Sequence, residues 1–266
     1  MNVWVLGSGS AGNALVLEAG GARVLMAACF PPRERARRLT AVGIAHASIE
    51  ALVLTYEHHD HARGLAAAAR WKWTVYASEG TASSLGELAR PVVRFASGST
   101  VPLRTMSLRT VRVAHDAAEP VAIIATSSAS GARVGIAHDL GHASRTVCAA
   151  LSDLDALVIE SNHDEGWLRA GPYPPSVRER IAGPYGHLSP RAAPPAAATC
   201  AHRKLARVVL AHLSQRCNSP RLAADAMRGA LSRTSFRGEV LVTTQDMPLA
   251  VSLSGDGGQA QLDFGW

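Results

Sequence analysis

The segment Thr55-Tyr56-Glu57-His58-His59-Asp60-His61 directly follows the apolar run Ala51-Leu52-Val53-Leu54. Three histidines and one aspartate therefore lie within four residues, at the end of an expected buried strand. Imidazole and carboxylate together are ligands suited to Zn²⁺ or a similar first-row metal. A solvated turn is more often built from Gly, Asn or Ser. The segment therefore predicts a metal site rather than an ordinary polar turn.

Three later apolar runs end in the same kind of side chain. His115-Asp116 follows residues 110–114, His138-Asp139 follows 134–137, and His212 follows 208–211. Any one such histidine would more often be the polar end of a surface turn. Four strand ends that are each followed by His or Asp favour one shared site, because a sheet fixes the direction of each ligand. Two metal ions about 3.5–4 Å apart with a bridging carboxylate would need this number of ligands.

The composition limits the class of protein. The chain has 266 residues, of which 47% are hydrophobic, and no apolar run approaches the roughly 20 residues that cross a bilayer. The first residues contain neither a basic segment nor a long apolar one, so we expect no signal peptide, no membrane partner and a cytoplasmic location. The four cysteines lack CxxC spacing and are expected to be free thiols: Cys29, Cys148, Cys200 and Cys217.

The net charge is +6, and Lys72 and Lys204 are the only lysines among the basic residues. An anionic partner such as a nucleic acid would explain this charge. A compositionally biased genome, rich in arginine and alanine codons, would explain it equally well. Charge alone does not separate the two explanations.

The hydrophobic pattern predicts strands and helices in a mixed order. Strands are expected at 3–6, 14–18, 23–27, 51–55, 74–77, 105–114, 121–126, 133–137, 156–160, 206–211 and 239–243, and helices at 31–42, 62–70, 143–151, 190–201 and 220–231. Residues 161–184 are expected to be rich in loops, and no run of strict β-α-β units is evident. The pattern predicts an α+β fold in which two packed sheets have helices outside. Because the Pro-rich pieces are short, one domain over residues 1–266 is expected.

Taken together, these motifs resemble the metallo-β-lactamase fold family. Within it, the chain looks like the YycJ/WalJ-like exonuclease branch, which is related more distantly to ribonuclease Z and the beta-CASP nucleases. The resemblance implies a four-layer αββα sandwich and extends over nearly the whole chain. The motifs that carry it are Leu6-Gly7-Ser8-Gly9-Ser10-Ala11-Gly12-Asn13, the Thr-x-x-His-x-Asp-His core from Thr55 to His61, His115-Asp116-Ala117, Asp139, Glu160-Ser161-Asn162-His163-Asp164, Gly186-His187-Leu188-Ser189 and Ala211-His212-Leu213-Ser214.

The resemblance also implies roles for particular residues. His58 and His115 would hold one metal ion, and a second would be held by Asp60, His61 and His212. Asp139 would bridge the two ions. The expected cofactor is Zn²⁺, as one or two ions, with Mn²⁺ as an alternative. Metal coordination lowers the pKa of water to about 7, which would supply a hydroxide to attack phosphorus.

Two residues are expected to act in catalysis, Asp60 and His187. His187 aligns with a histidine that lies near the scissile phosphate in ribonuclease Z-like enzymes. The resemblance therefore implies that it protonates the leaving group or contacts the phosphate. A loop histidine that caps a helix is the alternative interpretation.

The chain departs from the family pattern His-x-His-x-Asp-His at its first position, where it has Tyr56. It also has Ala27 where the family carries an aspartate that supports the metal-binding loop. A phenol is a poor ligand near neutral pH, since free tyrosine has a pKa near 10. His59 and His138 lie beside ligand positions, but adjacent residues on an extended chain point in opposite directions. We therefore expect a weakened or empty first site, and a second site with the full set Asp60, His61, Asp139 and His212.

Three functions are compatible with these residues. The first is a metal-dependent phosphodiesterase, most specifically a DNA exonuclease. The second is a catalytically weakened or inactive protein that binds nucleic acid or another partner, as Tyr56 and Ala27 suggest. The third is a hydrolase of small esters, lactones or phosphodiesters. A closed pocket would favour a small substrate and an open basic groove would favour a polymer.

Overall fold

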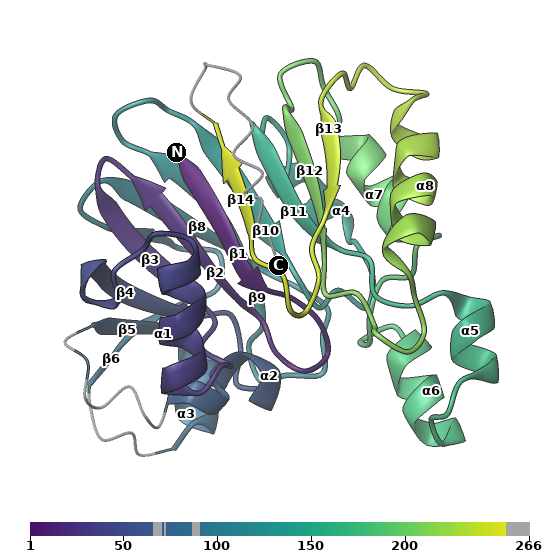
Figure 1. Ribbon diagram of the computed structural model, residues 1–266, viewed down its shortest axis with the longest axis horizontal. Coiled ribbons are helices and arrows are strands. Elements are labelled where there is room, and N and C mark those ends of the chain that lie inside the picture. Colours follow the sequence, from purple (N-terminus) through teal and green to yellow (C-terminus); the bar gives the residue numbers. More distant parts are fainter. Residues whose placement is uncertain (66–70, 72, 87–90, 254–266) are drawn as a thin grey trace.

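Two sheets packed face to face, with helices on both outer faces, form the fold (Figure 1). The computed structural model describes residues 1–65, 71, 73–86 and 91–253. The first sheet has the order β14-β1-β2-β3-β4-β5-β6, and the second has the order β13-β12-β11-β10-β9-β8-β7. The strands of the first sheet are β1 (Asn2–Gly7), β2 (Ala14–Ala19), β3 (Ala22–Met26), β4 (Ile49–Leu54), β5 (Thr74–Ser78), β6 (Val92–Phe95) and β14 (Leu249–Ser252). Those of the second are β7 (Thr100–Pro102), β8 (Met106–Arg112), β9 (Val121–Ser127), β10 (Arg133–Ala137), β11 (Ala156–Glu160), β12 (Arg207–Ala211) and β13 (Glu239–Val242).

Helices complete the outer layers. They are α1 (Pro32–Ala41), α2 (His59–Ala62), α3 (Glu79–Ser84), α4 (Arg145–Ala150), α5 (Glu165–Ala170), α6 (Pro175–Ala182), α7 (Ala193–Cys200) and α8 (Pro220–Leu231), with a 3-10 turn at His46–Ser48. Side chains of α1, α2 and α3 share a core with the first sheet. Those of α4, α7 and α8 share a core with the second. The expected four-layer αββα class is confirmed.

The apolar layer between the sheets explains why the strands read as continuous hydrophobic runs. Val5, Leu17 and Met26 of the first sheet face Ile136 and Val209 of the second, and all five are buried. Alternate residues of the same strands face the helices, so both faces of a central strand lie away from water. Each such side chain contributes roughly 1.5–3 kcal/mol through burial.

The parallel strands of the two sheets position the functional residues. Strands β3 to β6 are parallel to one another, as are β10 to β13. Because the carboxyl ends of parallel strands meet at one edge of a sheet, residues that follow β4, β10, β11 and β12 lie near one another. Strand β8 runs antiparallel to β9, which runs antiparallel to β10, so β8 also ends at this edge.

Two expectations about the elements were wrong. The first sheet does contain a run of β-α-β units, β3-α1-β4-α2-β5-α3-β6, which short helices and irregular links hide in the sequence. Residues 161–184 contain α5 and α6 rather than loop alone. Helix α6 has no buried residue, so it has no apolar periodicity from which to predict it.

The boundary of one expected helix also moves. Helix α2 begins at His59 and ends at Ala62, so His59, Asp60 and His61 lie in the helix itself. Residues 66–70 of the expected helix lie outside the described part of the chain. Among the described residues, no helix is both long and apolar enough to cross a membrane.

Candidate metal centre

Asp60, His61, Asp139 and His212 lie together where β4, β10 and β12 end. The Nε2 atom of His61 is 3.0 Å from Asp139 Oδ2 and 3.6 Å from Asp60 Oδ2. The Nε2 atom of His212 is 3.3 Å from the same oxygen of Asp60. One ligand atom from each of Asp60, His61 and His212 lies within 4.8 Å of the others. Residues far apart in the chain thus bring nitrogen and oxygen atoms close together.

The carboxylate of Asp139 shows that this set suits a cation. Both of its oxygens are buried without a hydrogen-bond partner, although ring nitrogens of His61 and His187 lie 3.0 and 3.1 Å away. An unpartnered buried carboxylate is costly unless a positive charge neutralises it. Two imidazoles and two carboxylates are a donor set that divalent first-row metals take. The residues therefore fit a bound metal ion.

Two of these residues have unusual backbone conformations. Asp139 and His212 both have a φ of 55°, in the left-handed region that non-glycine residues seldom adopt. Such a conformation costs of order 1–3 kcal/mol and occurs often at functional sites. Here it turns each side chain away from the strand direction, so that both residues face the site.

Glu160 is a functional residue to which sequence reasoning gave no role. It ends β11, is fully buried, and its Oε1 accepts from the Nδ1 atoms of His187 at 2.6 Å and His212 at 3.1 Å. Its Oε2 accepts from the backbone N–H groups of Leu140 and Leu188. Because Glu160 holds Nδ1 of both rings, Nε2 is left available in each: that of His212 for a metal, and that of His187 as a protonated donor. The signal in the sequence is a glutamate at the end of a wholly apolar strand.

His187 lies beside these residues and lines the pocket above them. Burial opposes protonation of the ring, but Glu160 and Asp139 outweigh it and raise the pKa of His187 to about 9. Its Nδ1 atom is held by Glu160, which leaves Nε2 as the free nitrogen. The helix-capping alternative has no support, because the ring bonds to Glu160 and lies 3.1 Å from Asp139.

His58 and His115 form a separate pair. Their ring centroids are 5.1 Å apart, and the buried ring of Tyr56 lies 5.0 Å from each of them. Burial and the neighbouring Asp139 and Asp60 carboxylates raise the pKa of Tyr56 well above its ordinary value. Tyr56 thus occupies the place expected for the first histidine as a neutral phenol. The carboxylate of Asp116 lies beside the pair, with Oδ1 3.3 Å from His115 Nε2.

The glycine-rich segment 7–13 reaches the site through Asn13. The Asn13 amide Nδ2 lies 3.3 Å from Asp60 Oδ2 and 3.2 Å from His61 Nε2. Its side-chain oxygen accepts from Ser8 Oγ, which in turn accepts from the backbone N–H of His212. This segment is therefore more than a hairpin turn, since it ties both halves of the site together. Local spacing gave no signal for this role.

Ala27, His59 and His138 take no part in these groups. His59 is exposed in α2. His138 is buried, its Nε2 has no hydrogen-bond partner, and it lines a small apolar cavity with Ala27, whose φ is 59°. Burial lowers the pKa of His138 to about 4, so its ring is neutral near pH 7. Neither spare histidine lies where it could replace the missing first ligand.

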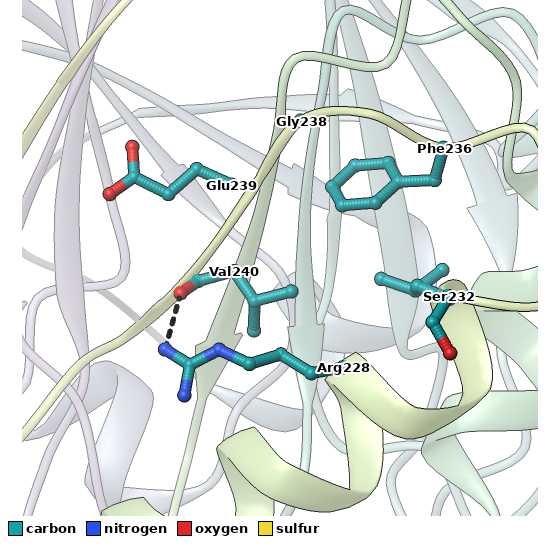
Figure 2. Close-up of a pocket in the computed structure, with 7 residues that line it drawn as sticks. Arg228, Ser232, Phe236, Gly238, Glu239 and Val240 are labelled. Carbon is teal, nitrogen blue, oxygen red and sulfur yellow. Dashed lines mark hydrogen bonds between the residues drawn. The ribbon is translucent and has the colours of Figure 1, made fainter.

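A pocket of about 200 Å³ opens above the site. Its floor includes Asp60, His115, His187 and His212, and its rim includes Arg180 of α6, whose side chain is 60% exposed. A larger pocket of about 340 Å³ lies elsewhere, between α8 and β13 (Figure 2). Its wall includes Arg228, which donates to the carbonyl of Val240. It contains no histidine or cysteine, so size alone does not identify the functional pocket.

A match to a known sequence family is consistent with this geometry. The family model described as the beta-lactamase superfamily domain matches residues 22–213, which contain every candidate ligand. The chain belongs to the beta-lactamase superfamily. Exodeoxyribonuclease YycJ of Bacillus anthracis, a superfamily relative, is 28% identical over 238 residues, covering 87% of this chain and 89% of its own. The expected resemblance to this branch is confirmed.

Solved structures with the superfamily fold match almost the whole chain. The metallo-beta-lactamase fold protein YhfI of Bacillus subtilis has a TM-score of 0.70 at 15% identity, covering 94% of this chain and 99% of its own. The short form of human tRNase Z has a TM-score of 0.64 at 18% identity, covering 96% and 100%. At these identities the likeness establishes the fold. The superfamily and its named relatives support a metal-dependent hydrolase.

Proposed function

We propose that the protein is a metal-dependent phosphodiesterase that acts as a DNA exonuclease. The proposed metal ligands are His58, Asp60, His61, His115, Asp139 and His212, with Zn²⁺ as the cofactor and Mn²⁺ as an alternative. The observation that carries the proposal is that Asp60, His61 and His212 converge, with Asp139 3.0 Å from His61, beside a pocket that His187 also lines. Such a site, with a proton donor beside it, suits hydrolysis of a phosphodiester.

Each residue has a distinct part in the proposed reaction. When bound, a divalent metal supplies an activated water and stabilises charge on the phosphoryl oxygens. Asp60 accepts a hydrogen bond from the Asn13 amide, which fixes the direction of its carboxylate, and it faces His61 and His212. His187 presents Nε2 to the pocket and delivers a proton to the leaving oxygen, since Glu160 holds its Nδ1.

A polymeric substrate is supported by the surface around the pocket. Helices α5 and α6 lie beside each other at the end of the sandwich near the site (Figure 1), and Tyr173, Val177 and Arg180 from this segment line the pocket. Trp167 in α5 and Tyr185 after α6 have exposed fractions of 48% and 60%. Exposed aromatic rings on the same segment as the pocket residue Arg180 suit stacking of unpaired bases.

The relative named exodeoxyribonuclease supports DNA as the polymer. A chromosomal substrate would also agree with a cytoplasmic location. The continuous core between the sheets, to which β1 and β14 both contribute, supports the proposal that residues 1–266 form one domain.

End-labelled DNA tests the proposal. Purified protein is incubated with single- and double-stranded DNA in the presence of Zn²⁺ or Mn²⁺, beside a His61→Ala variant prepared identically. The proposal predicts release of nucleotides by the wild-type protein and none by the variant. Equal release by both would identify a contaminating nuclease, and no release by either would remove the exonuclease function.

Tyr56 favours a second candidate, a weakened enzyme that chiefly binds nucleic acid. Its neutral phenol stands where the family has a ligand, so a bound metal would have fewer donors. The metal content of the native protein distinguishes this candidate from the exonuclease. A metal-free protein that binds DNA would favour the second candidate, whereas stoichiometric metal with nucleotide release would favour the first.

A further inference from the structure

His58 and His115 have a third possible ligand beside them. One ligand atom from each of His58, His115 and Asp116 lies within 4.8 Å of the others. We propose that Asp116 replaces the missing first histidine, so that the first metal position is held by His58, His115 and Asp116. Two imidazoles and one carboxylate with an open position are a donor set found in catalytic zinc sites. The inference rests on the proposed metal centre but not on the identity of the substrate.

Backbone carbonyls fix which nitrogen of each ring is available. His58 Nε2 lies 3.1 Å from the carbonyl oxygen of Asp116, and His115 Nδ1 lies 3.1 Å from that of Gly186. A carbonyl oxygen can only accept, so each of these nitrogens must carry the proton. The lone pairs therefore remain on His58 Nδ1 and His115 Nε2. Backbone carbonyls thus orient both rings so that each offers one nitrogen to a metal.

Arg180 leaves one oxygen of Asp116 free for a metal. The Arg180 Nε atom donates to Asp116 Oδ2, while Asp116 Oδ1 faces His115 Nε2 at 3.3 Å. The backbone N–H of Asp116 donates to the carbonyl of Tyr185, which anchors the residue against the chain that follows α6. A ligand whose second oxygen is hydrogen-bonded has a fixed direction, as metal ligands commonly do.

The other candidates for the vacant position are less suitable. Tyr56 is buried and uncharged, His59 is exposed in α2, and His138 lines the separate cavity beside Ala27. Asp116 alone among these combines a negative charge with a short distance to His115. Asp116 therefore takes the ligand role that the family gives to a histidine at position 56.

Zinc binding tests the ligand role of Asp116 independently of activity. Metal-free full-length protein is titrated with Zn²⁺ by calorimetry, and the ions retained after dialysis are counted by mass spectrometry. We compare wild type, Asp116→Asn, Tyr56→His/Asp116→Asn and, as a matched control, Asp225→Asn, whose carboxylate is exposed on α8. Thermal unfolding checks that each variant folds.

The expected result is two ions for wild type and Asp225→Asn, and one retained ion for Asp116→Asn, with the Kd of the second raised at least tenfold. The double variant should regain the second ion, because a histidine returns at position 56. That rescue would not occur if Asp116→Asn had merely loosened α6. Two ions in Asp116→Asn with unchanged affinity would overturn the inference, as would a single ion of equal affinity in wild type and Asp116→Asn. Either result together with nucleotide release by wild type would leave the proposed function intact, whereas wild type that binds neither Zn²⁺ nor Mn²⁺ would overturn both.

Discussion

One buried carboxylate, Glu160, prepares two histidines of the site. Both of its oxygens are used, Oε1 by His187 and His212 and Oε2 by two backbone N–H groups. Burial opposes its charge, but His187 outweighs that effect and holds the pKa of Glu160 at about 2. Glu160 therefore stays ionised near neutral pH, and its hydrogen bonds to both rings suit it to support the imidazoles.

Replacing Glu160 with glutamine should weaken metal binding while leaving the fold in place. Glutamine has nearly the same shape, but it removes the negative charge and can present an N–H to rings that need an acceptor. Loss of such a supporting group typically costs 10–100-fold in metal affinity or activity, and we expect about that loss for Glu160→Gln. Zinc titration of Glu160→Gln beside Glu50→Gln, whose carboxylate pairs with Arg104 at the surface, measures it. Equal affinities would show that Glu160 does not support the ligands.

Sequence spacing predicted the ligand types but not their support. His61, Asp139 and His212 each follow an apolar strand, so their convergence could be inferred from the pattern. Asn13 contacts Asp60, which lies 47 residues further along the chain, and Glu160 contacts His212, which lies 52 residues further along. A local sequence pattern cannot show that residues so far apart in the chain are in contact. The sequence alone gives no role to Asp116, because its proposed role depends on Arg180 and on the histidine missing at position 56.

Helix α1 anchors the glycine-rich segment that reaches the site. Arg38 is buried and donates to the carbonyls of Leu6 and Gln245, and Glu34 accepts from Arg38 and Arg37. The amide of Gln245 in turn bonds to Ala11 and Gly12. The helix thus connects the end of β1 with the chain after β13 through one arginine.

Glu34 should make stability depend on pH in a defined range. Hydrogen bonds from Arg37 are the main cause that lowers the pKa of Glu34 to about 2 from 4.5. A carboxyl whose pKa is lower in the folded state binds its proton more readily when unfolded. Its contribution is therefore complete above pH 4.5 and is lost as the pH falls toward 2. Urea unfolding of wild type and Glu34→Gln should show a difference that is constant from pH 6 to 8 and shrinks below about pH 4.5. A difference that grows in acid would contradict this assignment.

Short helices are the elements that sequence periodicity does not reveal. Helix α8, with buried Ala223, Met227 and Leu231 at helical spacing, was predicted with the same bounds. Helix α6 presents no buried residue, so its only sequence signal is Pro175 at the first position. Yet α6 supplies Arg180, Val177 and Ile181 to the pocket. The element most specific to the site was therefore the one least visible in the sequence.

Two sheets and the segment α5–α6 together shape one open site. The proposed ligands follow strand ends of both sheets, so they come together only when the sheets pack against each other. The fold class followed from the alternation of strands and helices and from the resemblance, since both reflect two buried layers. Strands β6, β7 and β14 are short edge or terminal strands without a clear apolar run, which is why the sequence did not predict them.

Exposed aromatic rings should distinguish a polymer from a small substrate. If Trp167 and Tyr185 stack on bases, each alanine variant should lose about 1–3 kcal/mol of binding free energy per base, or roughly a 5- to 150-fold rise in Kd for single-stranded DNA. Hydrolysis of bis(p-nitrophenyl) phosphate should change little. Fluorescence anisotropy with labelled DNA measures binding, and Val93→Ala, which alters an exposed apolar residue on β6, is the control. Unchanged DNA affinity in both variants would favour a small-molecule hydrolase.

Diffraction from zinc-loaded crystals, recorded on both sides of the zinc absorption edge, tests the proposed metal centre most directly. We predict an anomalous peak enclosed by Asp60, His61, Asp139 and His212, with ligand distances near 2.0–2.2 Å. A zinc-loaded crystal without a peak between these four side chains would contradict the account.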